Sequence, residues 1–252
     1  MTERDGQRTT RRYPCQICPL RPLDAFRPFE PEELAFVSTF KRGEVEVERG
    51  ETILSEGSLN PHLYTVLFGL GFRYKLLTDG RRQILNYIFP GDLVGLQASL
   101  MGEIAHSVEA LSAMLLCTFE RSRLPDLYRN YPGLAFDITW LAAREEQMLD
   151  ENLLSVGRRT ALERAAYLIA FLAARAMSVG LGEKDAVELP ITQMHIADTL
   201  GLSLVHTNKT IRKLVERRLV RWLERGCSVT DFDGLLALSG WEGLAEGQRP
   251  LV

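Results

Sequence analysis

The sequence predicts an α+β protein, with an N-terminal β-roll of jelly-roll type, then a long helix and a C-terminal winged helix-turn-helix. Three observations support this fold. Short β-rich runs fill the stretch from 41 to 124, an amphipathic pattern fills 133–158, and two short helical patterns meet at Gly201. We therefore expect four parts, which are an arm at 1–27, a β-roll at 28–132, a dimerisation helix at 133–158 and a winged domain at 159–252.

The composition is that of a folded chain. Its 252 residues are 46% hydrophobic, enough to bury the cores of two modest domains. Residues 1–15 carry charges where a signal peptide needs an apolar stretch, and the longest apolar run, 165–174, is too short to span a bilayer. We therefore expect a cytoplasmic protein that does not enter a membrane. In a reducing compartment its four cysteines are not expected to form disulfides.

The first half of the chain predicts one helix and then strands. Residues 28–40 predict a short helix, because acidic residues in its first turn complement the helix dipole. No run between 41 and 124 is long enough to predict a further helix. The β-rich runs there are 63–77, 82–89 and 113–119, and the turn pairs between them are Asp79-Gly80, Pro90-Gly91 and Gly91-Asp92.

Residues 133–158 predict a long amphipathic helix, because apolar side chains recur in steps of three and four. Its apolar stripe can pack on its own domain or on a second copy in a parallel coiled coil. Glu145 and Asn152 interrupt the stripe and would then help to set the register. The residues that we predict for a dimer interface are Leu134, Ile138, Leu141, Glu145, Met148, Leu149 and Asn152.

The last third predicts a helix-turn-helix with a wing. Residues 160–178 are apolar around most of their surface and indicate a buried helix. Two short helices follow in 191–220, where Ala197 lets them cross closely and Ser203 can cap the second. Residues 220–234 predict two short strands with Gly226 at their turn.

The second of these helices has a basic face. Between Leu204 and Arg225 there are seven Lys or Arg against two Glu, a local charge of +5 in a chain of net charge −3. Such a helix can enter a major groove, with Asn208 and Lys209 as base readers, although a structural hairpin or a solvated basic face is the alternative. Thr210, Ile211 and Leu214 can turn inward. The predicted DNA contacts are Ser203, Val205, His206, Asn208, Lys209, Arg212 and Lys213.

A β-roll with Asp-Gly and Pro-Gly-Asp turns, a long helix and a winged helix-turn-helix resembles the Crp/Fnr family of bacterial transcription regulators. Residues 63–95 and the sequence IADTLGLS at 196–203 carry the resemblance. It implies a homodimer that binds a palindromic site in double-stranded DNA and contacts RNA polymerase. No enzyme is expected, since the chain has no Gly-rich phosphate loop before a helix, no H-E-x-x-H and no nucleophile elbow.

The cyclic-nucleotide branch of that family binds its ligand with a Gly-Glu-Leu turn and an Arg-Ser pair in the β-roll. The corresponding stretch here is GLQ at 95–97, and His106 stands where the arginine would be. A mostly neutral imidazole does not replace a permanently cationic, bidentate donor to a phosphate. Cyclic AMP is therefore not expected, and nothing in the sequence gives His106 or His62 a haem role.

The oxygen-sensing Fnr branch holds a [4Fe–4S] cluster with three arm cysteines in a C-x2-C-x5-C run and a fourth in the β-roll. Cys15 and Cys18 match the first pair, Asp24 stands at the third position, and Cys117 matches the distal cysteine. The resemblance thus implies oxygen or redox sensing through a [4Fe–4S] cluster on three thiolates and, at one corner, a harder and more exchangeable carboxylate.

Other interpretations of these residues stay open. The arm cysteines can form a redox pair, bind zinc with other residues or have no role, and Cys117 can be an ordinary core cysteine. The regulator would then answer to a small molecule or haem in the β-roll, or to no signal. Cys227 fits no ligand pattern. Val205, Asn208 and Lys209 replace the Glu, Ser and Arg of the Fnr branch, so the half-site does not transfer. Leu149 is apolar where that branch carries an acid, which favours a tighter dimer.

Overall fold

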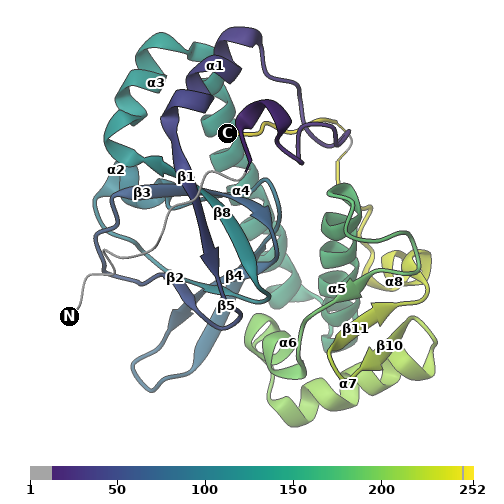
Figure 1. Ribbon diagram of the computed structural model, residues 1–252. Coiled ribbons are helices and arrows are strands. Elements are labelled where there is room, and N and C mark those ends of the chain that lie inside the picture. The colour runs from purple at the N-terminus through teal and green to yellow at the C-terminus, as the bar shows by residue number, and fades with distance from the viewer. Residues whose placement is uncertain (1–12, 246) are drawn as a thin grey trace. The chain divides into compact units, whose positions relative to one another are not determined.

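The computed structural model describes residues 13–245 and 247–252, and these form two compact units (Figure 1). The first unit holds the described residues up to Gly71, then Ile88–Arg144 and Gln248–Val252. The second holds Phe72–Tyr87 and Glu145–Gly247. This grouping differs from the predicted domains, because a hairpin of the β-roll joins the second unit and the last residues of the winged domain join the first.

The first unit begins with the cysteine arm and a helix. The 3-10 turn η1 (Cys15–Ile17) leads through a loop to α1 (Pro31–Phe40). Pro31 opens α1, and Glu30 and Glu33 form a reciprocal capping box, so the helix predicted in 28–40 is confirmed from residue 31 onward.

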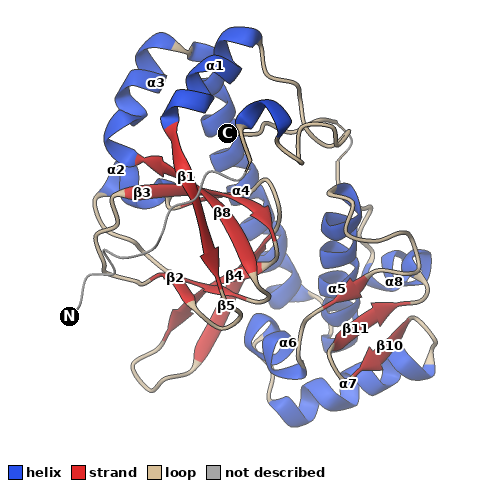
Figure 2. Cartoon of the chain, viewed as in Figure 1, coloured by secondary structure: helices blue, strands red, loops and turns tan. Residues whose placement is uncertain are grey.

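The strands of the first unit form an antiparallel sheet of order β1-β8-β3-β6, and β2 pairs with β7 in a second sheet. Figure 2 shows β1, β8 and β3 of the first sheet. Apolar side chains from these strands, among them Val66, Val108 and Leu116, make a core that excludes water. The bounds are β1 (Lys41–Val47), β2 (Thr52–Leu54), β3 (His62–Phe68), β6 (Leu93–Val94), β7 (Ser107–Ala110) and β8 (Met114–Glu120).

Short helices interrupt this sheet region. The expectation of no helix between 41 and 124 is wrong at α2 (Leu96–Met101), a six-residue helix that begins after Gly95 and ends before Gly102, both at positive φ. A helix of this length has too few residues to show periodicity in a sequence. The turn η2 (Arg121–Arg123) and α3 (Leu124–Asn130) follow β8.

The long helix α4 (Pro132–Arg158) and α5 (Ala161–Ser178) have nearly the bounds that their patterns predict. Thr160 caps α5 in a capping box with Glu163. The second unit also contains most of the neighbouring strands β4 (Gly71–Leu76) and β5 (Arg82–Ile88). No helix in the described ranges is long and apolar enough to cross a membrane.

The rest of the second unit is the winged helix-turn-helix. The helix pair α6 and α7 lies in the chain between β9 and β10 of a small sheet of order β10-β11-β9, and the predicted wing of two strands, β10 and β11, is confirmed. A further helix, α8, was not predicted; the Asp231 side chain caps it by accepting from the Gly234 N–H at 2.8 Å. The bounds are β9 (Glu188–Leu189), α6 (Gln193–Leu200), α7 (Leu204–Glu216), β10 (Val220–Leu223), β11 (Gly226–Val229) and α8 (Phe232–Ser239).

Candidate functional site

The chain turns sharply between α6 and α7. Gly201 adopts φ +63°, a left-handed conformation that ends α6, and the Leu202 N–H donates to the Ala197 carbonyl at 3.1 Å. The Ser203 hydroxyl accepts from the His206 N–H at 3.3 Å and caps α7. Gly201 therefore ends α6 at the turn and Ser203 caps α7, as the sequence predicts.

Helix α7 has one buried and one exposed face. Thr210, Ile211 and Leu214 are buried, together with Thr207. These buried side chains fix the rotation of α7 within its domain, so its polar face always points away from the domain. All the residues predicted to contact DNA are exposed, and their contact with DNA stays a prediction; they are Ser203, Val205, His206, Asn208, Lys209, Arg212 and Lys213.

The β4–β5 hairpin supports α6. The Arg82 guanidinium pairs with the Asp198 carboxylate at 2.8 Å, and the Gln83 amide donates to the Thr199 carbonyl at 2.9 Å. The buried Tyr87 hydroxyl lies 2.9 Å from the Thr199 hydroxyl, and burial raises the pKa of that phenol. No local sequence signal marks these contacts, because their partners are more than a hundred residues apart.

The wing contains the fourth cysteine. Cys227 lies opposite Trp222 in the β10–β11 pair and is fully buried. Burial raises the pKa of its thiol to about 12, so the thiol stays protonated at neutral pH. Cys227 is therefore a core residue of the wing.

The cysteine arm is attached to β1 by a buried ion pair. The Lys41 ammonium pairs with the Glu44 carboxylate, and both side chains are almost completely buried. The Lys41 ammonium also donates to the Tyr13 carbonyl at 2.6 Å, while the Tyr13 N–H donates to Glu44 Oε1 at 3.1 Å. This pair therefore fixes the backbone two residues before Cys15.

The three predicted cysteine ligands share the surroundings of Lys41. Cys117 lies opposite Glu44 across β1 and β8; burial raises the pKa of its thiol to about 12, and a hydrogen bond and the charge of Lys41 oppose the rise. Cys15 and Cys18 also interact electrostatically with Cys117, and Cys15 does so with Lys41. Burial raises the pKa of Cys18 as well. The fold thus brings together thiols that are a hundred residues apart.

Asp24 lies exposed in the turn after Leu20, and its place beside the thiols stays a prediction. In the part of the chain that the structure describes, no three His, Cys, Asp or Glu side chains are arranged to hold a metal ion. Lys41 and Glu44, which the sequence analysis did not single out, are charged neighbours of the thiols.

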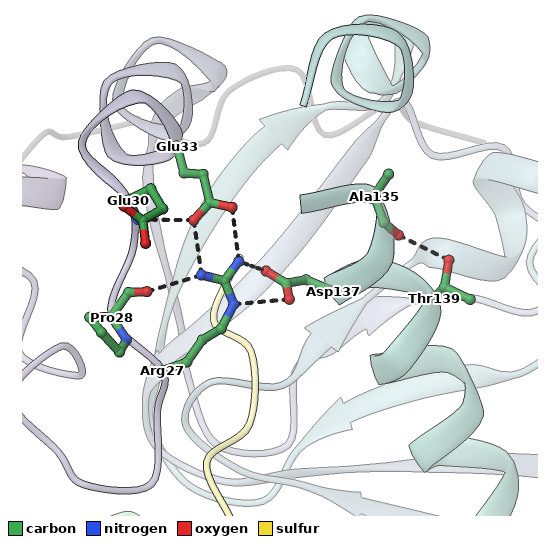
Figure 3. A network of polar contacts seen from close by, with 7 residues as sticks. All are labelled: Arg27, Pro28, Glu30, Glu33, Ala135, Asp137 and Thr139. Atoms are coloured by element: carbon green, nitrogen blue, oxygen red, sulfur yellow. Dashed lines mark hydrogen bonds and ion pairs between the residues drawn. The ribbon is translucent and has the colours of Figure 1, made fainter. Parts of the chain in front are cut away.

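The end of the arm is tied to α1 and α4 (Figure 3). The Arg27 guanidinium pairs with the Glu33 carboxylate through two hydrogen bonds of 2.9 and 3.0 Å. Its other edge pairs with the buried Asp137 of α4, with Nε at 3.0 Å from Oδ1. Bidentate pairing on two sides holds the guanidinium in one orientation and raises its pKa. The arm, α1 and the first part of α4 therefore form one network.

The residues predicted for a dimer interface divide into three groups on α4. Leu134, Ile138 and Met148 are buried within the chain, which is the own-domain packing that the pattern left open. Glu145 pairs with Arg73 at 3.0 Å, and the Asn152 amide donates to the Leu85 carbonyl at 3.0 Å. Leu141 is partly exposed and Leu149 is exposed. The exposed apolar side chains on α4 are Phe136, Leu149, Leu153, Leu154 and Val156.

The two histidines near the β-roll have different surroundings. His106 is buried. His62 lines an open pocket of about 720 Å³ with mostly apolar neighbours, including Leu59, Leu100 and Tyr128. The loop before β3, helix α2, the turn η2 and helix α3 supply most of the pocket wall.

Comparison with known proteins agrees with this architecture. Residues 44–131 match the cyclic nucleotide-binding domain, and residues 163–238 match the Crp-like helix-turn-helix domain. The chain is similar to the nitrogen fixation regulation protein FixK of Bradyrhizobium diazoefficiens, with 31% identity over 86% of this chain and 90% of that protein. It is 29% identical to the transcriptional activator protein FnrL of Cereibacter sphaeroides over 90% of this chain and 92% of that protein.

A solved structure is also similar. FixK2 from Bradyrhizobium japonicum superposes with a TM-score of 0.68 at 26% identity and covers 81% of this chain and 98% of its own. Both domains, their order and the long helix between them therefore have matches in known regulators. The chain belongs to the Crp/Fnr family of transcription regulators, which bind DNA through the helix-turn-helix and are not enzymes.

Proposed function

We propose that this regulator responds to oxygen or another oxidant through Cys15, Cys18 and Cys117, and that it binds a palindromic DNA site as a homodimer. One observation carries the proposal. Cys117 lies opposite Glu44 in the β1–β8 pair, and the buried Lys41–Glu44 ion pair also holds the backbone of Tyr13, two residues before Cys15. Packing alone does not require three thiols at one place, since free cysteine is replaceable there by other small apolar residues.

A [4Fe–4S] cluster is the cofactor that this donor set suits. Three thiolates from Cys15, Cys18 and Cys117 would be its soft ligands, and the Lys41 cation would offset the negative charge that such ligands bring. Asp24, in its exposed turn, is the proposed fourth ligand. When bound, the cluster would supply oxygen-sensitive redox chemistry, with a carboxylate at its most exchangeable corner.

The chain's own residues offer a path from this site to DNA. Tyr13 holds the start of the arm on the Lys41–Glu44 pair, and Arg27 holds its end on Asp137 of α4. A displaced arm would therefore release the start of α4. In the homodimer that helix would set the spacing of two recognition helices for successive major grooves. The resemblance to Crp/Fnr regulators also implies RNA polymerase as the protein partner on promoter DNA.

The test is the visible absorption spectrum of protein purified without oxygen, together with iron and sulfide assays. We expect a brown protein with about four irons per chain that loses its colour in air. Cys117→Ala should lose iron, whereas Cys227→Ala, which removes a buried thiol outside the site, should keep it. Colourless and iron-free wild-type protein would exclude the cluster.

A metal-free thiol switch is the second candidate, and one observation favours it: no described set of side chains is arranged as a closed metal site. Two of the thiols would form a disulfide, giving two electrons and two protons to a peroxide; hydrogen peroxide becomes two waters, and an alkyl hydroperoxide becomes an alcohol and water. Iron-free protein whose DNA affinity falls with peroxide and returns with a dithiol reductant would identify this mechanism.

A further inference from the structure

The last residues of the chain pair with the cysteine arm. We call residues 248–252 the strap. The Arg249 N–H donates to the Ala25 carbonyl at 2.8 Å, and the Arg27 N–H donates to the Arg249 carbonyl at 2.9 Å. These bonds form a parallel bridge between Phe26 and Arg249. The strap therefore runs parallel to the arm at Phe26, two residues after Asp24, and pairs with it as a short neighbouring strand would.

Side chains fix the strap on the β-roll. The Arg249 guanidinium donates to the Asp92 carboxylate at 2.7 Å and to the Pro90 carbonyl, and it lies 4.6 Å from the centre of the Phe26 ring. Leu251 and Val252 are buried, and the Thr65 hydroxyl donates to the Val252 carbonyl. The strap is thus attached through its backbone, its arginine and its apolar side chains.

The Pro90-Gly91-Asp92 turn is shaped to receive this contact. Gly91 has φ +84°, and a Cβ atom there would lie 2.3 Å from the Phe26 ring and 2.7 Å from the Arg249 guanidinium. Only a residue without a side chain lets Phe26 and Arg249 come this close to the turn. Turn, arm and strap therefore fit one another at a single place.

The chain is anchored again just before the strap, on the DNA-binding unit. Trp241 packs edge-on against Tyr167 and Phe171 of α5, with ring centres 5.6 and 5.9 Å apart. From Trp241 to Arg249 the chain advances by eight residues, which reach at most about 28 Å when fully extended. The tether between the winged domain and the cysteine arm is therefore short.

We propose that the strap couples the DNA-binding unit to the cysteine arm by a route separate from α4. Arg249 is the positioning residue of this link: it holds the arm at Phe26, and a displacement of the winged domain that extends the short tether fully would pull on that contact. DNA that fixes the winged domain would restrain the strap, and a displaced arm would free it. The proposal rests on DNA binding and holds whether the arm thiols are free or bind iron.

Hydrogen exchange tests this link on the full chain. The probe is a duplex that the wild-type protein selects from a random-sequence pool. The measurement is amide exchange in the peptide that contains Ala25–Arg27, where the Arg27 N–H is bonded to the strap. We expect DNA to slow this exchange by about threefold or more, because restraint of the strap makes local opening rarer.

The decisive variant carries six Gly and Ser residues inserted between Gly247 and Gln248. It keeps every contact of the strap but makes the tether long and flexible. Basal exchange in the arm should match the wild type, and its response to DNA should be lost. A purely structural strap would leave the response intact. That result, or a wild-type arm whose exchange ignores DNA, would overturn the proposal.

A point variant provides a second measurement. Arg249→Ala should raise basal exchange in the arm by about threefold or more, since the pairing with Asp92 and Phe26 is lost. Arg129→Ala is the matched control, because it removes the same charge from an exposed position on α3 outside the strap contacts. Equal exchange in both variants would contradict the role of Arg249.

Discussion

Lys41 is the residue on which the cysteine site depends most. Its ammonium is buried with the Glu44 carboxylate, and the backbone of Tyr13 bonds to both groups. Removing one charge of a buried ion pair leaves the other charge desolvated without its counter-charge. We expect Lys41→Met to lower the free energy of unfolding by about 3–5 kcal/mol, measured by urea denaturation.

Two control variants test whether the stability loss in Lys41→Met comes from the buried charge left on Glu44. The double variant Lys41→Met/Glu44→Leu should recover most of the lost stability, because an apolar pair of similar size replaces the ion pair. The adjacent Arg42 pairs with Glu120 at 3.1 Å but is 59% exposed, so Arg42→Ala should cost no more than about 1 kcal/mol. Equal losses in the Lys41 and Arg42 variants would refute the importance of the buried pair.

Cys227 makes stability depend on pH in the alkaline range. Burial raises the pKa of its thiol from 9.0 to about 12 in the folded protein. Between these values the unfolded chain has lost the proton that the folded chain keeps, so stability falls as pH rises. Wild-type protein should therefore lose about 1.4 kcal/mol per pH unit more than Cys227→Ala between pH 9 and 11.

Urea midpoints measured at several pH values check this expectation. Below pH 8 the thiol is protonated in both states, so the difference between the two proteins should be constant there. If the free energy of unfolding depended on pH in the same way for both proteins above pH 9, the wing would be open to solvent around Cys227.

Helix α7 is the element on which DNA recognition depends. Lys209 is exposed on the face opposite the buried Ile211 and Leu214. If it bonds a base, Lys209→Ala should weaken binding to the selected duplex by about 1–3 kcal/mol and relax its sequence preference. Fluorescence anisotropy at several salt concentrations measures both affinity and salt dependence.

Lys184→Ala is the control for this change. Lys184 is exposed in the same unit and pairs with Asp233 at 2.7 Å, away from α7. Its loss should leave affinity and sequence preference unaltered. A Lys209→Ala variant that binds like the wild type would show that α7 is misassigned as the recognition helix.

The exposed apolar residues of helix α4 lead us to predict a dimer. Leu153 is 73% exposed, and Leu149 and Val156 lie four residues before it and three after it, on the same side of the helix. A second copy would bury this stripe. Leu153→Asp should weaken dimerisation at least about tenfold in light-scattering measurements, whereas Leu181→Asp, off α4, should not. A wild-type monomer at micromolar concentration would contradict the dimer.

Periodicity and turn chemistry predicted most elements, and their failures have physical reasons. The extent of α4, the two faces of α7 and the capping role of Ser203 follow from local patterns. Helix α2 has six residues, too few to show a period, and the start of α8 falls within residues 220–234, which were predicted as the two strands of the wing. Glu44 and Glu46 look alike in the sequence and lie on the same side of β1, after its register shift. Glu44 is nevertheless buried and Glu46 exposed, because Tyr13 and Lys41 pack on Glu44.

At the scale of the molecule, the contacts that carry the functional proposals join distant parts of the chain. Arg27 meets Asp137, Lys41 lies beside Cys117, and the strap meets the arm at Phe26. Family spacing pointed to the three thiols, but no sequence pattern pointed to Lys41 or Arg249. Side chains that compensate a buried charge or receive a returning strand are determined by the folded topology, which local sequence does not encode.

The central claim is that the cysteine site controls DNA binding, and one measurement tests it most directly. The affinity of protein prepared without oxygen for the selected duplex is measured before and after exposure to air, in the wild type and in Cys15→Ala. We predict that air lowers wild-type affinity about tenfold or more, and that the variant binds weakly under both conditions. Equal wild-type affinity before and after air, matched by Cys15→Ala, would contradict the account.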